Sequence, residues 1–259
     1  MMNKKAIIIT ANIQKGGCGK STTIESLACS LGRRGKKVLV VDLDAQANIT
    51  FSSGAIESDK TIYNVLKREC DIVDVIQETK YFDIAPADIL LSGADIEFNT
   101  IGREYIVKRA LDPVMDKYDY ILIDTPPSLG TLSTNALTAC DYVVIPSVPS
   151  YYSTKGMIQL FNAIDSVKEY TNPNIKIAGV LLVRYKGYTK GNRTVADIVE
   201  NVTNHLQTRM FDTRIRECVK VDESQGEQIP LIDYAPKCTT ALDYEKLTDE
   251  LLGVIANDK

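Results

Sequence analysis

The sequence predicts an α/β fold: a doubly wound, mostly parallel β-sheet with helices on both faces, of the P-loop NTPase type. Three observations predict it. Short runs rich in Val, Ile and Leu alternate with segments of helical periodicity. Most of these runs lack polar alternation, which is typical of strands covered on both faces. No Pro/Gly/Ser-rich linker or low-complexity stretch divides the chain, so we expect residues 1–259 to form one domain.

The strands and helices follow from these periodicities in chain order. The predicted strands are Ala6–Thr10, Lys37–Val41, Phe82–Ala85, Tyr120–Ile123, Tyr142–Ile145 and Ile177–Leu182. The predicted helices are Lys20–Arg34, Ile101–Lys117, Thr131–Ala139, Gly156–Tyr170, Thr194–Leu206 and Thr239–Leu252. In such a sheet the ligand-binding residues follow the carboxyl ends of the strands.

A glycine-rich loop links the first predicted strand to the first predicted helix. It runs from Lys15 to Thr22 and reads K-G-G-C-G-K-S-T. Glycines let backbone N–H groups approach phosphates closely, and the N-terminus of the following helix adds partial positive charge. Lys20 is placed to meet the β- and γ-phosphates, and the Ser21 hydroxyl to bind Mg²⁺. We therefore predict an ATP and magnesium site made by Lys15, Gly16, Gly17, Cys18, Gly19, Lys20, Ser21 and Thr22.

Carboxylates follow two other predicted strands. Asp42 and Asp44 end the second strand, and Asp124 ends the run Y-I-L-I. Because parallel strands end at the same edge of a sheet, we expect these side chains beside the glycine loop. Asp124 matches a Walker B carboxylate that holds Mg²⁺. These partner motifs argue against interpreting the glycines as a simple turn.

Charge and cysteine content narrow the function classes. The net charge is −4, so the molecule as a whole is not drawn to DNA or to acidic membranes, and any such binding must be local. Residues 184–220 hold eight basic and four acidic side chains. The first apolar run is far shorter than the roughly 20 residues of a membrane span. Six cysteines without metal-ligand spacing indicate free thiols in a reducing cytoplasm.

The motifs together resemble those of the ParA family of deviant Walker partition ATPases, which belongs to a wider group that includes MinD. The shared patterns are K-G-G-x-G-K-[ST]-T in the loop, D-x-D-x-Q after the second strand and D-x-P-P-S-L-G after Asp124. The resemblance continues at residues 135–139, 151–156, 179–182 and 234–237, over nearly the whole chain. Three positions depart from the common patterns: Gln14 replaces the first P-loop glycine, Cys18 replaces Val and Ser21 replaces Thr.

The resemblance implies an ATPase in which bound ATP drives two subunits into a sandwich dimer. Lys15 matches the signature lysine that reaches the partner's nucleotide, much as an arginine finger does. Asp44 matches the carboxylate that orients or deprotonates the attacking water, although a helix-capping role for Asp44 is also open. Asp42 is expected to support the magnesium shell. The catalytic residues implied are Lys15, Lys20 and Asp44.

The leading functional hypothesis is partition of a plasmid, a mobile element or a chromosome. The ATP-bound dimer would bind duplex DNA without sequence preference on the nucleoid, and a ParB-like centromere-binding partner would stimulate hydrolysis. The candidate DNA contacts are Arg184, Lys186, Lys190, Arg193, Arg216 and Lys220. The family often has P-R-N-V-R where this chain reads R-E-C-V-K at residues 216–220, which weakens direct transfer of the family's contacts. The loop begins near residue 15, so we expect no N-terminal helix-turn-helix domain.

Two alternatives use the same ATP switch. A MinD-like ATPase would bind membrane through a C-terminal amphipathic helix, but the tail at residues 242–252 is acidic on its polar positions, so we expect no membrane partner. A scaffold-type ATPase would position another complex in the cell without DNA cargo, and the sequence does not separate it from partition. An iron–sulfur reductase would need cluster cysteines, and Cys140 lacks a matching partner.

Overall fold

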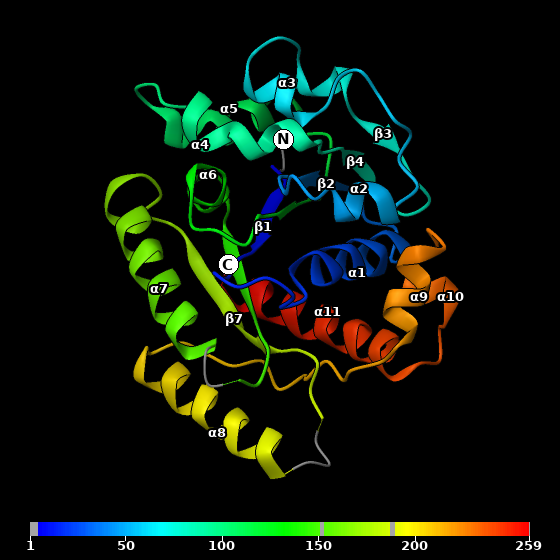
Figure 1. Ribbon diagram of the computed structural model, residues 1–259, viewed down its shortest axis with the longest axis vertical. Coiled ribbons are helices and arrows are strands. Elements are labelled where there is room, and N and C mark those ends of the chain that lie inside the picture. Colours follow the sequence, from blue (N-terminus) through cyan, green and yellow to red (C-terminus); the bar gives the residue numbers. More distant parts are fainter. Residues whose placement is uncertain (1–4, 151–152, 187–189, 259) are drawn as a thin grey trace.

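The computed structural model describes residues 5–150, 153–186 and 190–258, and the side chains of this part except those of residues 153–154 and 190–196. Its seven-stranded sheet has the order β3-β4-β2-β5-β1-β6-β7 (Figure 1). The strands are β1 Ile7–Ala11, β2 Val38–Asp42, β3 Gln77–Glu78, β4 Asp83–Ala85, β5 Tyr120–Asp124, β6 Tyr142–Ser147 and β7 Lys176–Leu182. All neighbours pair in parallel except β3 and β4. The predicted α/β class and mostly parallel sheet are confirmed.

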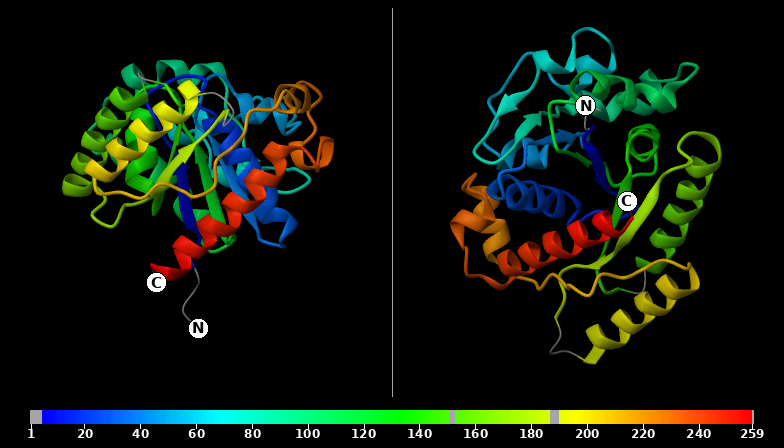
Figure 2. Two further views of the ribbon diagram at one scale, coloured as in Figure 1. Left: turned by 90° about the horizontal axis from the view of Figure 1, so that it is seen from below. Right: turned by 180° about the vertical axis from the view of Figure 1, so that it is seen from behind.

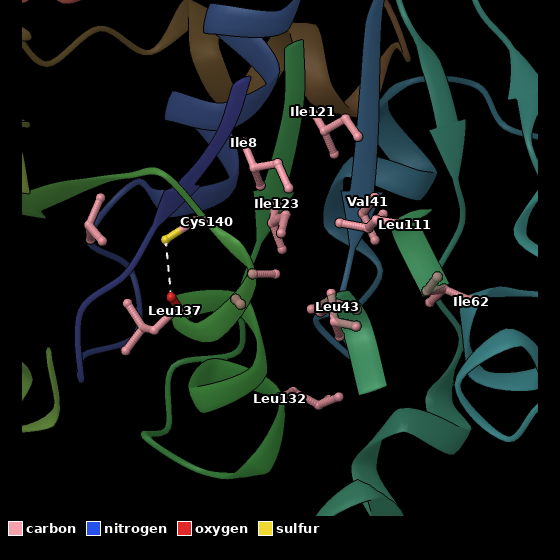
Figure 3. Close-up of a cluster of buried hydrophobic side chains, with 14 of the residues drawn as sticks. Ile8, Val41, Leu43, Ile62, Leu111, Ile121, Ile123, Leu132, Leu137 and Cys140 are labelled. Atoms are coloured by element: carbon pink, nitrogen blue, oxygen red, sulfur yellow. Dashed lines mark hydrogen bonds between the residues drawn. The ribbon is translucent and has the colours of Figure 1, made fainter. Parts of the chain in front are cut away.

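Alternation along the strands divides the apolar side chains between the two faces of the sheet. Ile121 and Ile123 of β5 belong to one buried cluster, whereas Leu122 between them belongs to another. Figure 3 shows the first cluster, where Ile121 and Ile123 lie near Ile8 of β1 and Val41 of β2. Both faces are thus covered, as the near-continuous apolar strands predict.

The longer helices lie where the sequence places them. They are α1 Lys20–Arg33, α6 Thr131–Ala139, α7 Ser153–Tyr170, α8 Lys190–His205 and α11 Thr239–Asn257. Helices α1 and α11 run side by side over one face of the sheet, with α6 and α7 over the other (Figures 1 and 2). No helix among the described residues has both the length and the apolar content that crossing a membrane requires.

One predicted helix is interrupted. The stretch expected to be helical from 101 to 117 contains a 3₁₀ turn at Arg103–Tyr105, the short helix α5 Ile106–Leu111 and a second 3₁₀ turn at Asp112–Val114. Gly102 takes a left-handed φ of 74° at the start, and Pro113 lacks an N–H at the end. The apolar periodicity of this stretch correctly indicated helical structure, but the prediction of one continuous helix over residues 101–117 is wrong.

Several short elements had no signal in the apolar pattern. They are β3 and the helices α2 Asn48–Ser52, α3 Ile62–Leu66, α4 Ala94–Glu97, α9 Lys220–Gly226 and α10 Leu231–Tyr234. Each of these helices is one or two turns long, which is too short for a helical period to show, and β3 has only two residues. Helix α9 packs against α10 and α2, at the side of the sheet where α1 begins.

Candidate functional site

The glycine loop (Lys15–Thr22) connects β1 to α1 at the carboxyl edge of the sheet. Gly17 and Gly19 both take a left-handed φ of 69°, a conformation that strains other residues. A Cβ atom added to Gly16 or Gly17 would meet no heavy atom within 4 Å, so open space lies above the loop backbone. The loop therefore leaves room for a ligand beside the N-terminus of a 14-residue helix.

Lys20 is buried at the first position of α1. Its ammonium donates a hydrogen bond to the Lys15 carbonyl at 3.4 Å, which is long for such a bond. Burial lowers the pKa of Lys20, and the negative charges of Asp124 and Asp44 oppose that shift. A buried cation thus lies within the field of two carboxylates beside the open loop.

Asp124 ends β5 and is completely buried. Neither carboxylate oxygen has a hydrogen-bond partner of normal geometry among the described residues. Burial, followed by the charge of Asp42, raises the pKa of Asp124 well above its usual range, while the nearby Ser21 hydroxyl and Lys20 act to lower it. An unpartnered buried carboxylate is costly unless a cation or donor completes it.

Asp42 lies directly opposite Asp124 in the register of β2 and β5, but its surroundings differ. One oxygen accepts hydrogen bonds from Thr50 N at 3.0 Å and Thr50 Oγ1 at 2.8 Å, and the other accepts from Asp44 N at 3.1 Å. Burial still raises the pKa of Asp42 to about 6. This carboxylate holds α2 against the end of β2, a local role that the sequence did not predict.

Asp44 is buried close to the loop, and its Oδ1 accepts a hydrogen bond from Gln46 N at 3.0 Å. The following helix α2 has Ala47 as its N-cap, with no side-chain cap. Asp44 therefore does not cap that helix, which removes the structural alternative considered for it.

Lys15 points back onto its own subunit. Its ammonium donates a hydrogen bond to Ser150 Oγ at 2.8 Å, across 135 positions of sequence. Ser150 follows β6, the strand next to β1, so the two side chains meet at the same edge of the sheet. In this conformation Lys15 is held beside the loop that carries it.

The described residues fit a magnesium ion that takes part of its shell from phosphate and water. No cluster of three or more His, Cys, Asp or Glu among the described residues can hold a metal alone. The Asp124 carboxylate and the adjacent Ser21 hydroxyl would supply two oxygen ligands to such an ion. Mg²⁺ in nucleotide sites commonly uses one or two protein oxygens in this way.

A cavity of about 400 Å³, here called the side cavity, opens next to the glycine loop. Gly17, Gly19 and Thr22 form one wall. The others are formed by residues 183–184, 215–219 and 221–222 and by Thr240 and Tyr244. Its volume lies within the range of small-molecule sites. No sequence pattern predicted this cavity, because its walls come from four segments far apart in the chain.

The distant walls are joined by an ion pair. Arg216 donates from Nε and from a terminal nitrogen to the two oxygens of the nearly buried Asp243, at 2.9 and 2.7 Å, and its backbone N–H also bonds Asp243. Thr240 Oγ1 donates to the Arg216 carbonyl at 2.7 Å. These bonds fix residues 215–218 against the first turns of α11.

Comparison with known proteins gives the family. An AAA domain model matches residues 5–177. The sporulation initiation inhibitor protein Soj of Bacillus subtilis is 39% identical over 249 residues, which cover 94% of this chain and 97% of Soj. The chromosome partitioning protein ParA of Myxococcus xanthus is 37% identical over 251 residues, covering 95% of this chain and 87% of that protein. The chain belongs to the ParA/Soj family of partition ATPases.

A solved structure agrees with this assignment. The cobyrinic acid a,c-diamide synthase of Mycobacterium smegmatis, with bound ATP analog and magnesium, is 29% identical with a TM-score of 0.85. The match covers 98% of this chain and 97% of that one. As a ParA/Soj family member, this chain is a P-loop ATPase. The loop Lys15–Thr22 between β1 and α1 is the candidate P-loop, and Asp124 at the end of β5 is the candidate Walker B carboxylate.

Four of the six basic residues predicted to bind DNA form ion pairs with acidic side chains of the same chain. Arg184 and Lys186 both pair with Glu217, Lys220 pairs with Glu223 at 2.6 Å, and Arg216 pairs with Asp243. The side chains of the other two candidates, Lys190 and Arg193 in the first turns of α8, lie outside the described residues. The DNA-binding role of all six stays a prediction.

Proposed function

We propose that this ATPase is an ATP-dependent partition switch, in which binding of magnesium and ATP drives sandwich dimerisation and non-specific DNA binding on the nucleoid. A ParB-like centromere-binding protein would stimulate hydrolysis and release the DNA. One observation carries the nucleotide part of the proposal: the buried, unpartnered Asp124 lies with Lys20 and Ser21 beside an open glycine loop. These are the charges that a magnesium-bound triphosphate needs.

Each residue of the site has a distinct role in this proposal. Lys20 and the backbone N–H groups of the loop bind the β- and γ-phosphates, while Ser21 and Asp124 hold the metal. Bound Mg²⁺ neutralises phosphate charge during transfer. Asp44, which is buried beside Lys20 and has one oxygen tied to Gln46 N, orients or deprotonates the attacking water. Asp42 acts indirectly, by holding α2 and the Asp44 turn in place.

The adenine base has a place in the side cavity. Thr22 and Gly19 line it from the phosphate side, and Val183 and Ile215 supply apolar surface. An aromatic base stacks well on such surface, with backbone groups available for its polar edge. The cavity and the glycine loop share Gly17 and Gly19, so one nucleotide can reach both.

Dimerisation requires Lys15 to change its partner. The ammonium now bonds Ser150 of the same chain, and it must leave that hydroxyl to reach phosphates bound by a second subunit. A cation delivered across an interface makes the dimer depend on bound ATP. The hydrogen bond to Ser150 therefore competes with the proposed contact of Lys15 across the dimer interface.

Substitution of Asp44 by Ala tests the catalytic assignment. We expect ATP binding and dimerisation to persist, while the hydrolysis rate falls about 100- to 10,000-fold, the usual contribution of a general base. Size-exclusion chromatography with ATP and a phosphate-release assay measure the two effects. Asp59→Ala, at an exposed loop position, is the matched control. Hydrolysis at the normal rate in Asp44→Ala would remove Asp44 from the water-activating role.

The ion pairs of Glu217 give a direct test of DNA binding. Glu217 neutralises Arg184 and Lys186, so Glu217→Gln should strengthen binding to duplex DNA if those cations contact phosphates. The salt dependence of binding should also become steeper, by about 0.9 in the log–log slope per added phosphate contact. Arg184→Ala should have the opposite effect, and Glu227→Gln, an exposed position, is the control.

A scaffold-type ATPase without DNA cargo is the second candidate. The observation that favours it is the matching of Arg184, Lys186, Arg216 and Lys220 by acids, which leaves little free positive charge among those four. If Glu217→Gln and Arg184→Ala both leave DNA affinity in ATP unchanged, partition by these residues is excluded and the scaffold reading is preferred.

A further inference from the structure

Two cysteines from separate segments lie next to each other, one of them in the wall of the side cavity. Cys218 lines the cavity just before α9, and Cys238 is the N-cap of α11, where its sulfur accepts a hydrogen bond from Ala241 N at 3.4 Å. Burial raises the pKa of Cys238, and the Cys218 thiol, which lies within hydrogen-bonding reach, raises it further. Both side chains are partly exposed.

The surrounding bonds keep the two thiols together. Two residues before Cys218, Arg216 is held by Asp243, and its carbonyl accepts from Thr240 Oγ1. Thr240 and Asp243 lie in the first two turns of α11, directly after Cys238. Both segments are therefore anchored to each other within a few residues of the sulfur atoms, so their approach does not depend on a chance side-chain contact.

The other four cysteines do not offer such a pair. Cys18, Cys29 and Cys140 are buried, which keeps them from reagents in solution. Cys70 is partly exposed but lies between α3 and the 3₁₀ turn at Ile72–Asp74, in a different part of the fold. Cys218 and Cys238 are therefore the cysteines that are both partly exposed to solvent and close to another thiol.

We propose that Cys218 and Cys238 form a redox-sensitive dithiol that closes to a disulfide and clamps the wall of the side cavity. The oxidant is a low-molecular-weight disulfide. One cysteine thiolate attacks it, forming a mixed disulfide and releasing one thiolate; the second cysteine then attacks the mixed disulfide and releases the other. One S–S bond forms in the protein, one is broken in the oxidant, and two cysteine protons are given up in exchange for two reduced small thiols.

The disulfide would close residues 219–237 into a loop that contains α9 and α10. Helix α9 supplies Val221 and Asp222 to the cavity and reaches α1 through a contact between Gln225 and Thr22 at 3.4 Å. Fixing Cys218 to α11 restricts the movement of this wall. We expect nucleotide exchange to slow in the oxidised protein; this consequence rests on the proposed nucleotide function, whereas the disulfide itself does not.

Mass spectrometry tests the disulfide directly. The full chain is treated with oxidised glutathione, blocked with N-ethylmaleimide and digested, and we expect a linked peptide that joins Cys218 to Cys238. Cys218→Ser and Cys238→Ser should each abolish that link, and serine at position 238 replaces the capping sulfur with an oxygen that also accepts from the helix N-terminus. Cys70→Ser is the control and should leave the link intact. Absence of the linked peptide in the unmodified chain, or stable glutathione adducts in its place, would overturn the proposal.

Release of a fluorescent ADP analogue tests the clamp. We expect release from the oxidised chain to be about threefold slower or more, since opening of a closed wall then limits exchange, and dithiothreitol should restore the original rate. Cys218→Ser should show no change with oxidant. A linked peptide with an unchanged release rate would overturn the clamp. A reduced chain that binds no nucleotide would overturn the proposed function, while the peptide result would still decide the dithiol.

Discussion

The glycine loop and the side cavity meet at Gly17 and Gly19, but they are built in different ways. The loop is one continuous segment between β1 and α1, and its shape follows from local backbone conformation. The cavity walls come from segments around residues 184, 216 and 240, joined by the pair between Arg216 and Asp243. The shape of the loop is therefore set locally in sequence, whereas the adjoining cavity depends on long-range packing.

Substitution of Lys20, the buried cation of the glycine loop, should have the largest effect on ligand binding. We expect Lys20→Ala to abolish binding of both ATP and inorganic triphosphate, a loss of about 4 kcal/mol for a preorganised charge at the phosphates. Isothermal titration calorimetry measures both ligands. Lys36→Ala, an exposed lysine beyond the end of α1, is the control. Retained triphosphate binding in Lys20→Ala would show that the loop is not the phosphate site.

Asp42 and Asp124 lie opposite each other in the register of β2 and β5, but substitution by Ala should affect them differently. Asp42→Ala removes the acceptor of three hydrogen bonds and should lower the free energy of unfolding by about 3 kcal/mol. Asp124→Ala removes a buried carboxyl whose oxygens have no hydrogen-bond partner of normal geometry among the described residues, so stability in the absence of nucleotide should fall less than for Asp42→Ala, while magnesium-dependent ATP binding is lost. Urea unfolding with and without magnesium and ATP measures both. Equal destabilisation by the two substitutions would contradict the difference in their surroundings.

Glu25 lies in α1, one turn beyond the glycine loop, and should make stability depend on pH. It is buried, accepts a hydrogen bond from Ser52 Oγ at 2.7 Å, and burial raises its pKa from 4.5 to about 7. The folded chain therefore keeps a proton that the unfolded chain loses, so the stability falls as pH rises from about 4.5 to 7.

The size of this effect is about 3 kcal/mol, from about 1.4 kcal/mol per pKa unit. Glu25→Gln should flatten that slope, and urea unfolding between pH 5 and pH 8 measures it. Glu57→Gln, in an exposed loop, should keep the slope of the original chain. An unchanged slope in Glu25→Gln would assign the pH dependence to other groups.

Weakening the ion pair that holds the wall of the side cavity should have the smallest effect. It should show whether the side cavity and the glycine loop contribute independently to ligand binding. We expect Asp243→Asn to cost about 2 kcal/mol of stability, because it weakens a pair with one nearly buried member. ATP affinity should fall while inorganic triphosphate affinity stays the same. Asp249→Asn is the control, since its pair with Arg34 is exposed and such pairs contribute little. A parallel loss for both ligands would show that cavity and loop act as one unit.

The sequence alone determined the sheet, its long helices and the position of the glycine loop. Continuous apolar runs such as β5 predict strands covered on both faces, and strand, glycines and helix in succession predict the loop. It also placed Asp42 and Asp124 at the same sheet edge, which the register confirms. These features depend on neighbouring residues and on the periods of helix and strand, so they can be read along the chain.

Only the tertiary structure decided how those residues are used. Asp42 and Asp124 look alike at the ends of their strands. Thr50 donates two hydrogen bonds to Asp42, whereas Asp124 accepts none of normal geometry from the residues that the structure describes. Lys15 meets Ser150, and Cys218 meets Cys238, because the sheet order and the docking of α11 bring distant segments together. The physical reason is that burial and hydrogen bonding depend on all neighbours in space, and a local pattern specifies only those nearby in sequence.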